Sequence, residues 1–160
     1  MTLVSRFSGT AIRSRNMSAP DTAPAFADLE IGDRAPSLVV ENLTRTNFVR
    51  YAGASGDFNP MHHDETIATA AGNPSVFGHG MLTAALMARV VKEWFGPESM
   101  RRYHVRFSKQ VFPGDTLTFG ATITGKHEEG GTALVDLDLT ATNQDGVEVL
   151  TGSATAAVEG

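Results

Sequence analysis

Residues 79–95 read HGMLTAALMARVVKEWF, the most apolar segment of helical length in the chain. The pattern predicts one continuous helix, and after the opening His-Gly its polar side chains are Thr83, Arg89, Lys92 and Glu93. A helix that is apolar nearly all round has to be covered on most sides. A segment of about 15 residues is too short to cross a bilayer, so the expected cover is protein.

Four segments after this helix have the alternation of apolar and polar residues that is typical of β-strands. Turn sequences separate them: PGD at 113–115, EEGG at 128–131 and NQDG at 143–146. A fifth apolar and β-branched segment precedes the helix. The sequence therefore predicts a five-stranded antiparallel sheet, from SLVVENL (37–43), RYHVRFSKQV (102–111), TLTFGATITG (116–125), TALVDLDLTAT (132–142) and VEVLTGSATAAV (147–158).

Two shorter helices are predicted between the first strand and the long helix. Thr44 or Thr46 can cap one that runs roughly through 47–54, and a second begins at DETIA and ends before Gly72 and Pro74. This order indicates an α+β fold in which one sheet curls around a central helix. Such a sheet keeps open edges, so we expect two copies to pair as a homodimer, with a heterodimer left open.

Composition excludes several classes of protein. A chain of 160 residues is expected to form one main domain. Its net charge of -5 and its lack of a dense basic cluster argue against nucleic-acid binding. The absence of cysteine excludes disulfides, thiolate nucleophiles and cysteine–zinc sites, and no apolar run is long enough to span a membrane.

The first 20 residues contain three arginines and four serines but no acidic residue. That composition is typical of a mitochondrial transit peptide, but it also fits a disordered tail or a true translation start at Met17. We expect residues 1–27 to lie outside the core and 28–160 to form the folded domain. The expected compartment is the cytoplasm, or the mitochondrion if residues 1–20 are a transit peptide.

The segment GDFNPMHHDE, residues 56–65, places many polar side chains on one short loop. A turn that leads into a helix explains part of this pattern, since Asn59 precedes a proline and Asp64 can cap the next helix. A metal site built from His62, His63, Asp64, Glu65 and His79 is an alternative, but the chain has no HExxH spacing. It also has no G-x-S-x-G segment for a serine nucleophile.

The signature G-D-x-N-P-x-H at 56–62, followed by FGHGML at 77–82 and RFSKQVFPGDTL at 106–117, carries a resemblance. Over roughly 29–158 the chain resembles the MaoC-like family of (R)-specific enoyl-CoA hydratases and 3-hydroxyacyl-thioester dehydratases, which have the hotdog fold. The resemblance implies an acyl-CoA or acyl carrier protein substrate, a hydro-lyase reaction in fatty-acid metabolism, and no cofactor or metal. By position it implies that Asp57 and His62 are the catalytic pair and that the Gly80 N–H forms the oxyanion hole.

The side chains of Asp57 and His62 and the backbone of Gly80 suit acid–base chemistry on a thioester. A carboxylate and an imidazole on one short loop can share a water molecule, and imidazole exchanges protons near neutral pH. Backbone N–H groups at a helix N-terminus lack partners and favour negative charge, and a glycine there allows close approach. The sequence leaves open whether Asn59 caps the turn or contacts the ligand. It also leaves open whether His79 lines the site or bonds to a backbone carbonyl.

Two further points are left open by the sequence. Arg106 and Lys109 could meet the phosphates of a CoA or carrier arm, but plain solvation is the simpler expectation for surface basic residues. Hotdog proteins also include acyl-thioesterases and non-catalytic subunits that bind the acyl chain within a heterodimer. The presence of both Asp57 and His62 favours a catalytic subunit.

Overall fold

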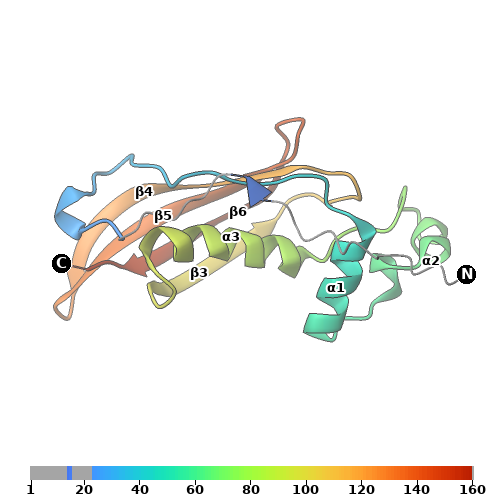
Figure 1. The fold of residues 1–160 in the computed structure, drawn as a ribbon, viewed down its shortest axis with the longest axis horizontal. Coiled ribbons are helices and arrows are strands. Elements are labelled where there is room, and N and C mark those ends of the chain that lie inside the picture. Colours follow the sequence, from blue (N-terminus) through green and yellow to red (C-terminus); the bar gives the residue numbers. More distant parts are fainter. Residues whose placement is uncertain (1–13, 16–22, 160) are drawn as a thin grey trace, which may run out of the picture.

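The computed structural model describes residues 14–15 and 23–159. One antiparallel sheet with strand order β1-β2-β4-β5-β6-β3 curves around the helix α3, and the helices α1 and α2 lie beyond one end of the sheet (Figure 1). This is the predicted α+β arrangement, the hotdog fold. The helices are α1 (Arg45–Ser55), α2 (Glu65–Ala70) and α3 (Gly80–Phe95), with short 3-10 turns η1 (Phe26–Asp28) and η2 (Pro60–His62). The strands are β1 (Ser14–Arg15), β2 (Leu38–Val40), β3 (Met100–Phe107), β4 (Leu117–Glu129), β5 (Thr132–Thr142) and β6 (Glu148–Ala157).

Helix α3 provides one side of the hydrophobic core. Met87, Val90 and Val91 are fully buried, and the helix contacts β3, β4, β5 and β6. The cover is incomplete, because Met81 is 59% exposed at the first turn and Ala85 is exposed one turn later. The expectation of a covered helix is therefore confirmed on the sheet side, and a strip of α3 faces away from the sheet.

The concave face of the sheet forms the other side of the core. Neighbouring buried side chains meet across β4 and β5, where Phe119 pairs with Ala141 and Ala121 pairs with Leu139. Intervening residues such as Thr118 and Asp138 are less buried, as the period of two requires. The alternation read from the sequence thus corresponds to a dry inner face and a wetter outer face.

Strand β3 lies at the far edge of the sheet and pairs only with β6 among the described strands. The turn at 113–115 therefore does not join two paired strands, because β3 and β4 are separated by β5 and β6. At this edge Gly152 of β6 is required, since a Cβ atom there would lie 2.2 Å from the carbonyl oxygen of His104. The Tyr103 hydroxyl donates a 2.6 Å hydrogen bond to the Ala84 carbonyl, which fastens the edge strand to α3.

The N-terminal region differs from the expectation in two places. Ser14 and Arg15 form the short strand β1, which pairs with β2 and makes the sheet six-stranded rather than five-stranded. Phe26 is half-buried against the core, and the Lys126 ammonium donates to its carbonyl at 2.7 Å, so the core begins before residue 28. The rest of the expected tail, residues 1–13 and 16–22, lies outside the described part of the chain. Among the described residues, no helix has the length and apolarity needed to cross a membrane.

Candidate active site

The loop between α1 and α2 is shaped by its own side chains. Helix α1 is followed by the C-cap residue Gly56, whose φ of 74° is accessible to glycine at little cost. The Asp57 Oδ1 atom accepts from the Asn59 N–H at 3.2 Å, and the Asn59 side chain accepts from the Met61 N–H at 3.1 Å. Pro60 then begins the 3-10 turn η2, which ends at His62. These local bonds direct Asp57 and His62 toward one another.

His62 is buried at the base of this loop, with 8% of its surface exposed. Its Nδ1 atom lies 2.8 Å from the Phe77 carbonyl oxygen. A carbonyl oxygen only accepts, so Nδ1 carries a proton, and in the neutral ring the lone pair is on Nε2. The Phe77 ring packs edge-on against the imidazole, with centroids 5.1 Å apart, and holds its plane.

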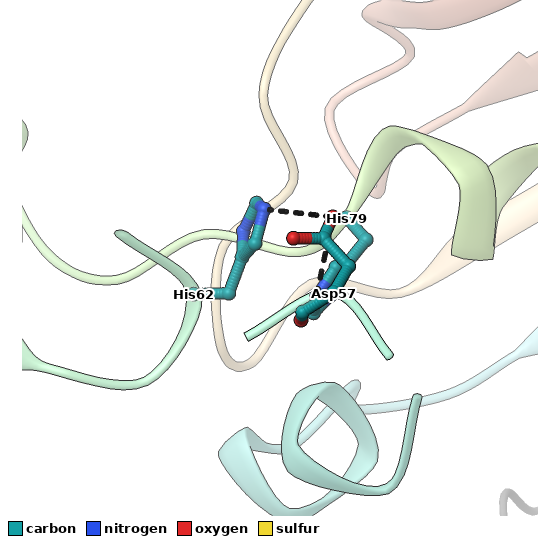
Figure 2. A group of neighbouring side chains, drawn as sticks. All are labelled: Asp57, His62 and His79. Carbon is teal, nitrogen blue, oxygen red and sulfur yellow. Dashed lines mark hydrogen bonds and ion pairs between the residues drawn. The ribbon is translucent and has the colours of Figure 1, made fainter. Parts of the chain in front are cut away.

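The Asp57 carboxylate faces the free Nε2 atom of His62 across a gap. Its Oδ2 atom lies 4.0 Å from His62 Nε2 and 3.9 Å from His79 Nε2 (Figure 2). The first distance is too long for a direct hydrogen bond, and contacts of that length are commonly bridged by water. About half of the Asp57 side chain is exposed, so solvent reaches the gap from the outside.

The third member of the cluster is His79, immediately before α3. It is 2% exposed, and its Nε2 atom lies 3.0 Å from the Asp57 carbonyl oxygen. Its ring stacks on that of His62, with centroids 3.7 Å apart and planes inclined by 30°. The two imidazoles therefore join the loop to the start of α3.

Gly80 opens α3 beside this cluster. Its N–H is the first of the helix and has no acceptor among the described residues, as expected for a helix N-terminus. Gly80 is exposed and lines a pocket of about 330 Å³. A Cβ atom at this position would lie 3.2 Å from the Phe107 ring, which also lines the pocket. The pocket lining is mainly apolar. Its other members are the apolar Phe77, Gly78, Val111 and Val149 and the polar Thr83, Ser108, Lys109 and Gln110.

A sequence profile described as MaoC like domain matches residues 30–144. The chain belongs to the MaoC-like family. It is 40% identical over 76 residues to the 3-hydroxyacyl-thioester dehydratase X of Mycobacterium tuberculosis, a match that covers 48% of this chain and 26% of that protein. The chain spans 26% of the length of this dehydratase, and 9% and 13% of the length of two other curated relatives.

Solved structures have the same fold. The R-hydratase PhaJ1 from Pseudomonas aeruginosa superposes with a TM-score of 0.75 and 27% identity, covering 85% of this chain and 86% of that one. The ChsH1-ChsH2 complex from Mycobacterium tuberculosis gives a TM-score of 0.71 and 25% identity, with 81% of this chain and 98% of that chain covered. One of these neighbours is described as a hydratase and the other as a complex of two proteins.

Within this MaoC-like chain, the other polar residues of the loop have separate structural partners. Asp64 caps α2 by accepting from the N–H groups of Thr66 and Ile67, as its position predicted. Glu65 forms a 2.5 Å ion pair with Arg45, whose hydrogen bond holds the pKa of that carboxyl below its usual value. The exposed His63 ring lies 3.2 Å from the Phe58 carbonyl. Within the described part of the chain, none of the three forms a side-chain hydrogen bond or ion pair with Asp57 or His62.

The arrangement of Asp57, His62 and His79 also resembles a metal site, because one candidate ligand atom from each lies within 4.8 Å of the others. The ring hydrogen bonds reduce the available donors. His79 uses Nε2 to donate to the Asp57 carbonyl, so the nitrogen that faces the Asp57 carboxylate carries a proton rather than a lone pair. Two ligands, Asp57 Oδ2 and His62 Nε2, remain in this tautomer, fewer than the three protein ligands of catalytic zinc sites.

Sequence reasoning did not find the walls of the pocket. Phe77 supplies the carbonyl that sets the His62 tautomer, and Phe107 approaches Gly80 from the edge strand. Both residues lie in motif segments whose pattern gives no sign of these contacts, FGHGML at 77–82 and RFSKQVFPGDTL at 106–117. The first role follows from a contact between residues 15 apart and the second from the contact of the start of α3 with the end of β3, and no local pattern predicts either.

Proposed function

We propose that this chain catalyses the (R)-specific addition of water to trans-2-enoyl thioesters, giving 3-hydroxyacyl thioesters, or the reverse dehydration. The observation that carries the proposal is the 4.0 Å gap between Asp57 Oδ2 and His62 Nε2. It lies beside an unpaired helix N-terminal N–H at Gly80 and an apolar pocket. Membership of the MaoC-like family and the similarity to an R-hydratase support the same reaction and its stereochemistry.

The gap suits a single water molecule. In the hydration direction, the water oxygen bonds to C3 of the enoyl group, and the electron pair of the double bond shifts toward the thioester oxygen. One member of the Asp57–His62 pair takes a proton from the water, and a proton is delivered to C2 as the carbonyl re-forms. Both added groups come from water, so the reaction needs no further reactant, and the pair returns to its starting protonation.

The negative charge that develops on the thioester oxygen has to be stabilised, and this is a larger energetic requirement than the proton transfers. The Gly80 N–H is positioned before the reaction and lies at the positive end of the α3 dipole. Removing one comparable donor in another enzyme lowers the rate by about 10²–10³. The buried body of α3 holds this donor in place, because its next turns pack against the sheet.

We propose that the pocket holds the acyl chain or the pantetheine arm of the thioester substrate. Apolar side chains line most of it, and Lys109 and Gln110 are among its polar lining residues. We propose that Lys109 meets a phosphate of the carrier, either CoA or acyl carrier protein; solvation of its ammonium group is the alternative. The compartment, cytoplasm or mitochondrion, depends on N-terminal residues outside the described part of the chain.

A homodimer is the proposed assembly. Strand β3 has eight residues and one strand neighbour among the described strands, and an open edge of that length favours pairing with another copy. The exposed Met81 and Phe107 lie close to this edge and would be covered in the same step. Pairing with a different subunit is the alternative, which the similarity to a two-protein complex supports.

The competing function on this fold is acyl-thioester hydrolysis. One assay separates the two activities: crotonyl-CoA is incubated with the chain expressed alone, and enoyl absorbance and free thiol are followed together. We expect loss of absorbance without thiol release, and chiral chromatography should show the 3R product. Thiol release at the same rate as absorbance loss would indicate a thioesterase, and no change in either signal would favour a non-catalytic subunit.

A further inference from the structure

His79 has no assigned part in the chemistry, yet it contacts both members of the Asp57–His62 pair. It is 2% exposed and occupies the N-cap position of α3, but its side chain does not cap the helix. The side chain instead extends away from the helix to residues of the preceding loop. One contact is the 3.0 Å hydrogen bond from Nε2 to the Asp57 carbonyl oxygen.

The ring of His79 also fixes the position of the catalytic imidazole. It stacks on His62 at a centroid distance of 3.7 Å, while Tyr51 of α1 packs on it at 5.1 Å. His62 is thus held by the near-perpendicular ring of Phe77 and by the ring of His79 stacked on it. Removing either contact would let the His62 ring rotate relative to Asp57.

The hydrogen bonds of the His79 ring argue against an acid–base role for this residue. Its Nε2 atom donates to a carbonyl, and its Nδ1 atom is buried without a hydrogen-bond partner among the described residues. An N–H group at Nδ1 would be buried without an acceptor among the described residues, which is costly. Because Nε2 is the donor of the bond to the Asp57 carbonyl, His79 presents no lone pair to the Asp57 carboxylate 3.9 Å away, and it cannot accept a proton on that side.

Asp57 needs such an anchor. The loop around it is exposed, and its carboxylate is held locally by the 3.2 Å bond from the Asn59 N–H. The bond from His79 joins this loop to the first turn of α3, where Gly80 follows directly in the chain. One side chain therefore sets the distance between the water-binding pair and the oxyanion donor.

We infer that His79 is a positioning residue of the active site, which acts through Asp57 and His62 and contacts neither substrate nor the transferred proton. The inference rests on the proposed hydratase function and adds a residue to it. A misplacement of the pair of about 1 Å is enough to lower the rate roughly 10²-fold. A His79 substitution should lower kcat rather than raise KM, because the pocket beside Gly80 does not include His79.

The test compares His79→Gln with His79→Asn. Both side chains end in the same amide, but only glutamine is long enough to place its N–H group where Nε2 of His79 lies. We expect kcat of His79→Asn to be about 10²-fold below wild type, with KM changed less than about threefold. The kcat of His79→Gln should be at least about tenfold higher than that of His79→Asn. His63→Gln is the matched control: its ring also contacts a carbonyl on this loop but not the pair, and it should keep wild-type kcat.

A double-mutant cycle separates positioning from an independent role. If His79 acts through Asp57, the His79→Asn change costs little more once Asp57→Asn is present. Equal losses in the two backgrounds, or wild-type kcat for His79→Asn, would overturn the inference. Thermal denaturation confirms that each variant is folded.

Failure of the proposed function is recognisable separately, because the wild-type chain would then be inactive on every enoyl thioester tested. The positioning role is in that case judged by crystal structures of the wild type and His79→Asn. A wider separation of Asp57 Oδ2 from His62 Nε2 in the variant supports the inference, and an unchanged separation overturns it.

Discussion

The carboxylate of Asp57 and the imidazole of His62 face each other at 4.0 Å, although the two side chains differ in exposure. Asp57 is half exposed and His62 is buried, so one reaches solvent and the other is held by the protein. Such a pair can admit water on one side while keeping the base fixed on the other.

Replacing either member of the pair should abolish most activity without unfolding the chain. General acid–base groups contribute about 10²–10⁴ to the rate, so Asp57→Asn and His62→Gln should each lower kcat within that range. Steady-state hydration of crotonyl-CoA measures the effect. Asp57→Asn should also keep its melting temperature, because the side chain is half exposed; near wild-type kcat in both variants would refute the assignment.

Gly80→Ala should impair catalysis by moving the pocket wall. The new Cβ atom would lie 3.2 Å from the Phe107 ring, so either the ring or the helix start has to shift by a few tenths of an ångström. We expect kcat/KM to fall, by up to about 10²-fold. Adding Phe107→Leu should restore part of the loss, since the smaller side chain makes room.

The matched control for this substitution is Gly53→Ala. Gly53 lies within α1, and a Cβ atom there has no neighbouring atom within 4 Å. Alanine should stabilise the helix by about 0.5–1 kcal/mol and leave the hydration rate unchanged. Equal rate losses at both glycines would show that a general response to added Cβ atoms, and not the Phe107 contact, is responsible.

Tyr103 should make stability depend on alkaline pH. Burial raises the pKa of its phenol to about 12, above the value of about 10 for an unfolded tyrosine. Between these values the unfolded chain loses the proton and the folded chain keeps it, so the free energy of unfolding should fall as pH rises from about 10 to 12. Urea denaturation at pH 9 and pH 11 measures this fall.

Tyr103→Phe is the comparison for that titration. The variant lacks the hydrogen bond to the Ala84 carbonyl and should be less stable at pH 8 by about 0.5–1.5 kcal/mol. It should also lose the part of the alkaline decline that comes from the phenol. An identical decline in both proteins would assign the pH dependence to other groups.

Asp64→Ala should affect stability rather than chemistry. Asp64 Oδ1 accepts from the Thr66 N–H at 2.9 Å and caps α2, and losing such a cap typically costs about 1 kcal/mol. We expect a lower melting temperature and an unchanged kcat measured well below it. Asp64→Ser preserves a capping oxygen and should restore the melting temperature; a large loss of kcat in Asp64→Ser would show that the carboxylate itself takes part.

Local patterns predicted much of this protein, because they depend on residues close together in the chain. The period of two at 132–142, the apolar run at 79–95 and the capping positions Thr44 and Asp64 each correspond to an observed element or cap. The motif at 56–62 located the two side chains of the pair on one loop. It could not show that they converge.

Convergence, strand order and the pocket arise from contacts between distant segments. The strand at 100–107 lies beside β6 and not beside the next strand in sequence, because packing on α3 decides which edge it occupies. His79 reaches Asp57 across 22 residues, and Phe107 closes on Gly80 across 27. Hydrophobic periodicity states which face of an element is dry, but the identity of the partner on that face depends on how the whole chain packs.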